Sequence, residues 1–204
     1  MPDAPGPTAH DVAPGRYTRV AVALHWIIAV IIVAQLIGGV VMHKLPNTVS
    51  WKIDAYQMHK SFGLIVLALA LVRLGWRMTH KAPPLPDGTK GWERMLARGT
   101  HVAFYVLMIG VPLAGWWMIS GSPYPSTFLF LFPIPDLPGA GLLSHDAWEE
   151  THEIMAKLVI GLLVLHVAAA LKHHYWDRDG VLARMVPGLS KPVPAPNDAV
   201  RGTA

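Results

Sequence analysis

Four long stretches of the chain are almost free of charged residues. The first and third runs, residues 20–42 and 99–120, contain none, and the second and fourth contain none over residues 61–72 and 158–171. A helix that crosses the hydrocarbon core needs about 20 apolar residues, which the first and third runs supply. The other two reach this length because lysine and arginine at their ends can extend to the headgroups. We predict an all-α fold, an integral membrane four-helix bundle, with spans at about 18–43, 57–78, 95–120 and 147–176.

The composition supports membrane spans over helices buried in a soluble bundle. The chain is 52% hydrophobic and only 15% charged, whereas soluble domains carry about a quarter charged residues. So few charges would not cover a soluble surface. The net charge of +4 is small, and in an apolar chain basic residues mark topology, so we expect no nucleic-acid partner. The absence of cysteine excludes disulfides, iron–sulfur clusters and thiolate zinc sites, and leaves the 11 histidines as the main candidate metal ligands.

The two ends of the chain differ from its middle. Residues 1–15 are rich in proline and glycine and have no basic segment followed by an apolar one, so we expect no signal peptide there. Residues 188–204 have a similar composition. We expect both to be disordered tails that flank one transmembrane domain at residues 16–187, with no internal repeat.

Lysine and arginine predict the orientation of the bundle. They are frequent before the first span, between the second and third, and after the fourth, but absent between Ser120 and Lys157. Because cytoplasmic loops are rich in lysine and arginine, both termini are expected to be cytoplasmic, in a multi-pass protein of the bacterial inner membrane. The loop after Ser120 is rich in proline and aromatic residues. Its prolines prevent a fifth span, and we expect it to lie on the membrane surface or to cap the bundle.

Five histidines lie in or near the spans at two depths. His152 and His166 are 14 residues apart in the fourth span, which is a rise of about 21 Å and a rotation within about 40° of the same helix face. His59 opens the second span on the outer side and matches His152 in depth. His25 begins the first span and matches His166. His101, about one turn into the third span, is a second candidate partner for His166.

Two histidine pairs stacked across a bilayer suggest two haems, each held by two imidazoles and suited to electron transfer. The sequence has no CxxCH motif, so the haems would be of the non-covalent b type. Zinc or copper, as in a non-haem metal transporter, would want three or four ligands at one depth. Arg73 follows His59 by 14 residues and so lies near the cytoplasmic level. A buried arginine needs an anion, such as a haem propionate, unless it extends to the headgroups.

Five segments of the chain are informative together: "RYTRVAVALHW", "QMHKSFG", "VRLGWR", "RGTHVAFYVLMIGVPLAG" and "WEETHEIMAKLVIGLLVLHVAAALKHHYW". With them the chain resembles the bacterial cytochrome b561 family of four-helix, dihaem b membrane cytochromes, over about residues 16–187. It looks particularly like the branch described as superoxide:ubiquinone oxidoreductase, or superoxide oxidase. The resemblance implies that His25 and His166 bind one haem iron and that His59 and His152 bind the other.

The same resemblance implies a ubiquinone site near the cytoplasmic haem, lined by His101 and His173. A histidine there can hydrogen-bond a quinone carbonyl and supply a proton. His173 follows His166 by seven residues, close to two helical turns, so it is expected on the same face, whereas His174 is expected to meet headgroups.

The resulting function is transmembrane electron transfer from a periplasmic one-electron donor such as superoxide to ubiquinone. Lys44, Lys52 and Lys60, near the outer side, could attract an anionic donor, although acidic residues at the start of the fourth span oppose a uniformly positive surface. The third loop is longer, richer in proline and more aromatic than is usual in the family. Because the donor would arrive at this loop, the difference leaves the outer-side substrate open. The alternative is a haem b membrane anchor that relays electrons for a partner dehydrogenase or hydrogenase.

Overall fold

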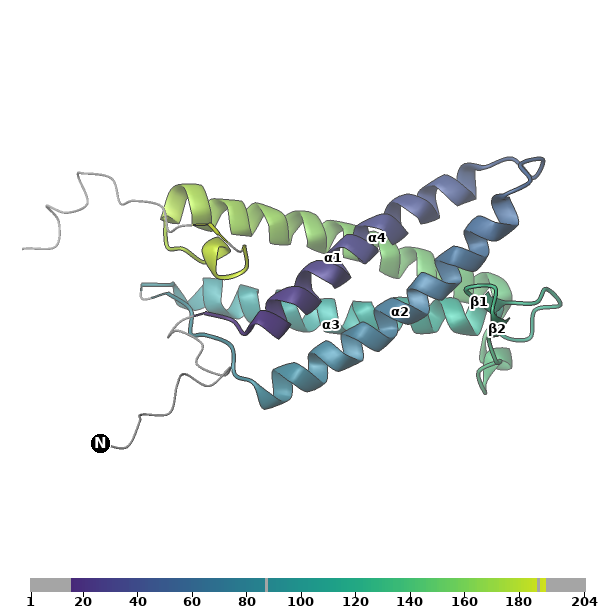
Figure 1. The fold of residues 1–204 in the computed structure, drawn as a ribbon, viewed down its shortest axis with the longest axis horizontal. Coiled ribbons are helices and arrows are strands. Elements are labelled where there is room, and N and C mark those ends of the chain that lie inside the picture. Colours follow the sequence, from purple (N-terminus) through teal and green to yellow (C-terminus); the bar gives the residue numbers. More distant parts are fainter. Residues whose placement is uncertain (1–15, 87, 187, 190–204) are drawn as a thin grey trace, which may run out of the picture.

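Four long helices make up the protein (Figure 1). The computed structural model describes residues 16–86, 88–186 and 188–189. All four helices are long and apolar enough to cross a membrane, which confirms the predicted all-α fold. The expected tails at 1–15 and 188–204 lie outside the described residues, except for 188 and 189. The helices are α1 (Arg19–Lys44), α2 (Lys52–Thr79), α3 (Gly91–Ile119) and α4 (His145–Lys172).

The helices pack in chain order, α1 against α2, α2 against α3 and α3 against α4. Consecutive helices run in opposite directions, so the ends of the helices gather at two ends of the bundle (Figure 1). We call the end where α1 and α3 begin and α2 and α4 finish the terminal end, and the opposite one the hairpin end. The buried core cluster is small, formed by Ile28, Ala70 and Met108. Apolar side chains such as Val30, 66% exposed, cover the outside, as expected for a surface that faces lipid.

The helices extend beyond the apolar runs that predicted them. Thr18 caps α1 by accepting a hydrogen bond from the Ala21 amide, and Ser144 caps α4 in the same way from Ala147. Helix α2 begins at Lys52 rather than near 57, and α3 at Gly91 rather than near 95. Their first turns are too polar for a hydropathy pattern to include. At 1.5 Å per residue, α3 is about 44 Å long, so its ends project past a hydrocarbon core of about 30 Å.

The loop between α3 and α4 folds onto the hairpin end. It contains a short antiparallel pair, β1 (Thr127–Phe128) and β2 (Phe132–Pro133), and a 3₁₀ turn, η1 (Ala140–Leu142). Strand β1 packs against α2 (Figure 1). The predicted absence of a fifth span is confirmed for this loop, because its described residues form no long helix.

Helix α4 ends in an irregular turn at the terminal end. Residues His173–Asp177 (η2) form a π-helical turn, which Arg178 closes in a left-handed conformation at φ 51°. The chain then returns through a 3₁₀ turn, η3 (Leu182–Arg184). There the Trp26 indole of α1 donates a hydrogen bond to the Met185 carbonyl at 2.7 Å. Single π turns inside α-helices often mark functional positions.

Candidate functional site

At the hairpin end, helices α2 and α4 bring two imidazoles together. The ring centroids of His59 and His152 lie 6.3 Å apart, and the ring planes are inclined by 75°. Both side chains are half-buried. These are the two histidines that the sequence places at the same depth on the outer side.

At the terminal end, three imidazoles meet instead of two. The ring of His166 lies 6.1 Å from that of His25 and also 6.1 Å from that of His101, measured between centroids. The Phe104 ring meets His166 edge-on at 5.3 Å. Distance alone therefore does not select the partner of His166, and both alternatives considered from the sequence are present in the fold.

The spacing within each pair suits one metal ion between two imidazoles. A ring nitrogen that binds a metal lies about 2 Å from it, so two opposed imidazoles on one ion have centroids roughly 6 Å apart. The pairs His59–His152 and His25–His166 both have this separation. The two levels thus fit haem iron, the group that the histidine pattern suggests.

A hydrogen bond and two glycines position the imidazoles of the hairpin-end pair. The Nδ1 atom of His152 lies 2.9 Å from the Val111 carbonyl, which can only accept, so Nδ1 carries the proton and Nε2 is left for a ligand. Gly115 lies close to the His152 ring, because a Cβ at this position would be 3.1 Å from it. At Gly39 a Cβ would lie 3.4 Å from His59. Small residues here allow helix backbones and a macrocycle to approach closely.

Gln35 is a residue of this site that the sequence analysis did not single out. Its side-chain amide donates a 2.8 Å hydrogen bond to the backbone carbonyl of His59 and so ties α1 to the turn of α2 that carries the imidazole. The sequence does contain a signal for this role, because Gln35 is a polar side chain in the middle of an uncharged run. Polar groups within a membrane usually hydrogen-bond across helices.

Arg73 lies at the terminal-end level and points into the bundle. Its Nη1 donates a 2.7 Å hydrogen bond to the Ala21 carbonyl of α1. In the part of the chain that the structure describes, no carboxylate pairs with it. A small cavity of about 30 Å³ beside it is also lined by Arg77 and Tyr105. The guanidinium keeps donors for an anion, which suits a haem propionate.

His173 pairs with carboxylates at the end of α4. Its Nδ1 lies 2.5 Å from an oxygen of Asp179 and 3.2 Å from one of Asp177. The Asp177 carboxylate also accepts from Lys172 at 2.6 Å. His101 is the other residue that the resemblance places at the quinone site. Its ring lies beside that of His166. His174 is half-buried, and its Nδ1 is enclosed without a hydrogen-bond partner among the described residues, so it does not reach out towards headgroups.

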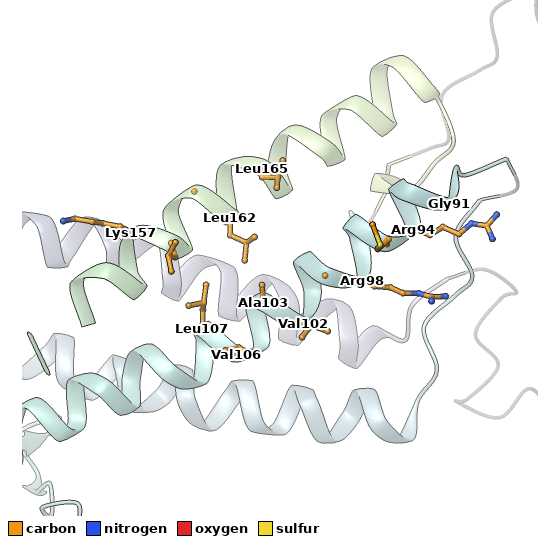
Figure 2. Close-up of a pocket in the computed structure, with 14 residues that line it drawn as sticks. Gly91, Arg94, Arg98, Val102, Ala103, Val106, Leu107, Lys157, Leu162 and Leu165 are labelled. Carbon is orange, nitrogen blue, oxygen red and sulfur yellow. The ribbon is translucent and has the colours of Figure 1, made fainter. Parts of the chain in front are cut away.

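A groove between α3 and α4 lies away from the histidines. It measures about 1180 Å³ on the outer face of the two helices, with apolar walls that include Val106 and Leu162 (Figure 2). Arg94 and Arg98 stand at its terminal end. No histidine lines it, so it does not hold the metal ligands.

Comparisons with known proteins point to one family. A family model described as prokaryotic cytochrome b561 matches residues 16–188. Cytochrome b561 homolog 2 of Escherichia coli (strain K12) is 31% identical over 174 residues, which cover 85% of this chain and 92% of that protein. The probable superoxide oxidase CybB of Yersinia pestis is 25% identical over 174 residues, 84% of this chain and 96% of that protein. Cytochrome b562 of Cereibacter sphaeroides is 29% identical over 175 residues, 83% of this chain and 94% of that protein.

Proposed function

This chain belongs to the prokaryotic cytochrome b561 family, whose members are haem b proteins of electron transfer in membranes, and we propose that it oxidises superoxide, or another one-electron donor, and reduces ubiquinone. The observation that carries the proposal is the pair of histidine levels, one near each end of the bundle. Haem b at each level would supply a one-electron carrier, so the molecule can connect the two sides of a bilayer.

The proposed ligands are two histidines at each level. His59 and His152 would hold the hairpin-end haem, and His25 and His166 the terminal-end haem, giving two haems in one chain. The His152–Val111 hydrogen bond supports this assignment because it fixes the ring with Nε2 towards the ligand. Arg73 would pair with a propionate of the terminal-end haem.

We place the ubiquinone near the terminal-end level, beside His101 and His173. The support for His101 is its contact with His166, which puts a second imidazole within reach of an electron acceptor. The support for His173 is its carboxylate pair, because a histidine held by Asp179 can receive a proton from water and pass it on. Reduction of one ubiquinone to ubiquinol consumes two electrons and two protons, and oxidation of two superoxide anions to two dioxygen molecules supplies those electrons.

The donor side follows from the proposed orientation in the bacterial inner membrane. With both termini in the cytoplasm, the hairpin end faces the periplasm, where superoxide would arrive. Lys60 lies near His59 at that end, and its ammonium donates to the Ser126 hydroxyl at 2.9 Å. A cation beside the entry favours an anionic donor. The relative named a probable superoxide oxidase supports this choice of donor.

Rapid mixing tests the proposal. Purified, oxidised protein is mixed with superoxide in a stopped-flow spectrometer, with and without a short-chain ubiquinone, and the b-type α-band is followed. We expect haem reduction within milliseconds, and reoxidation when ubiquinone is present. A protein that gives a full b-type spectrum with dithionite but none with superoxide would contradict the proposed donor and favour the relay for a dehydrogenase or hydrogenase.

A further inference from the structure

The β1–β2 hairpin is bound to the side of α2 by polar side chains. Gln57 accepts a hydrogen bond from the Thr127 amide at 3.1 Å and donates one to the Pro125 carbonyl at 2.9 Å. One turn further on, the fully buried Ser61 hydroxyl accepts from the Leu129 amide at 2.8 Å. The hairpin is therefore fixed at a defined height on α2.

The turn of the hairpin holds apolar residues in an unfavourable backbone conformation. Leu129 and Phe130 have φ values of 48° and 61°, in the left-handed region that L-residues rarely adopt. The Leu131 amide closes the turn on the Phe128 carbonyl at 2.9 Å. Asparagine and glycine are the usual residues in such a turn. Strain of this kind is retained where the side chains are needed, and here they are leucine and phenylalanine.

The side chains at the tip of the hairpin, residues 130–132, contact little of the protein. Phe130, Leu131 and Phe132 are 53%, 75% and 55% exposed. No charged residue occurs over residues 121–135. An exposed apolar cluster of this kind marks a surface that binds protein or membrane.

The height of the hairpin on α2 favours the membrane, and not another protein, as the partner of the tip. Helix α2 has 28 residues and is about 42 Å long, so about 6 Å of each end projects from a centred hydrocarbon core of about 30 Å. Ser61 lies nine residues after Lys52, about 14 Å along the helix. The strands that Ser61 holds are thus level with the outer part of the bilayer.

The backbone of the hairpin is suited to that depth. Non-helical chain is tolerated there only if its polar groups are paired. The amides of Thr127, Leu129 and Leu131 all have acceptors, and Ile134 donates to the Ser126 carbonyl at 2.8 Å. Prolines at 125, 133 and 135 have no amide hydrogen to satisfy.

We propose that residues 130–132 insert into the lipid leaflet at the hairpin end, in the outer part of its hydrocarbon region. The hairpin would then anchor the end of α2 that carries His59. The lipid surface is the partner, because the tip is uncharged and level with the bilayer.

Spin labelling tests the insertion directly, since the chain has no cysteine of its own. Leu131→Cys carries a nitroxide in vesicles of phosphatidylethanolamine and phosphatidylglycerol, and collisions with dioxygen and with a water-soluble nickel chelate are compared. Val30→Cys in α1, 66% exposed, is the lipid reference, and Glu149→Cys, exposed at the start of α4, is the aqueous one. The optical spectrum of each variant shows whether the fold is intact, and Phe132→Cys replaces Leu131→Cys if that variant loses haem.

We expect the ratio of dioxygen to nickel collisions at position 131 to be several-fold higher than at 149 and close to that at 30. A ratio equal to that at 149 would place the tip in water and overturn the proposal. Low collision rates with both reagents would also overturn it, because they would show that a protein partner or a second copy covers the tip. These readouts do not depend on superoxide or quinone activity.

Discussion

The imidazoles of His59 and His152 meet edge-on with 6.3 Å between their centroids, although the two residues belong to different helices and are far apart in the chain. Around His166 the same separation occurs twice, to His25 and to His101. The geometry thus offers one partner for His152 but two for His166, and we propose a separate role for the third histidine, His101.

Replacing His25 or His101 by alanine shows which of the two is a haem ligand and which contacts quinone. His25→Ala should remove about half of the haem, because His166 loses its proposed partner. His101→Ala should keep both haems and slow the reoxidation of reduced protein by ubiquinone. Haem content and quinone reduction are measured on both purified variants. Loss of haem in His101→Ala, with haem retained in His25→Ala, would reverse the assignment.

A larger residue at Gly115 should disturb haem binding more than the same change at a glycine without close neighbours. In Gly115→Val the new Cβ meets the His152 ring at 3.1 Å, so the ring must move and the hairpin-end haem should be lost or altered. Gly161→Val in α4 is the matched control, because a Cβ there has no neighbour within 4 Å. Haem content and the low-spin electron paramagnetic resonance signals report the change. Equal effects of the two substitutions would show that Gly115 serves only general helix packing.

The sequence predicted much of this arrangement because the decisive signals are local. The uncharged runs define the helices, and the 14-residue spacing of His152 and His166 places both on one face of α4. The π-helical turn at His173 was not predicted, since a change of hydrogen-bond pattern leaves no mark on hydropathy. The hairpin on α2 was not predicted either, because it depends on how the loop packs against the helix, which no periodicity encodes.

Arg73→Gln should lower the midpoint potential of one haem. A guanidinium near a haem stabilises the reduced, more negative state, and its removal is worth on the order of 1 kcal/mol, or tens of millivolts. Redox titration of the α-band measures both potentials. Arg98→Gln is the control, because Arg98 lines the outer groove and not the histidine level. If both variants keep the wild-type potentials, Arg73 does not act on a haem.

Lys60→Gln should slow haem reduction by superoxide and weaken its dependence on ionic strength, because a positive charge near the donor end is lost. Lys60→Arg keeps the charge and should stay close to the wild-type rate. The second-order rate constant is measured by stopped flow at several salt concentrations. If Lys60→Arg is slowed as much as Lys60→Gln, the contact with Ser126, and not the charge, accounts for the effect.

The most direct test is the number of haems held by each level. The pyridine haemochrome assay on purified protein, with protein determined independently, gives haem per chain for the wild type, His59→Ala and His166→Ala. We predict two b-type haems in the wild type and one in each variant, with a different midpoint potential lost in each. One haem in the wild type, or two remaining in either variant, would contradict the assignment of one haem to each histidine level.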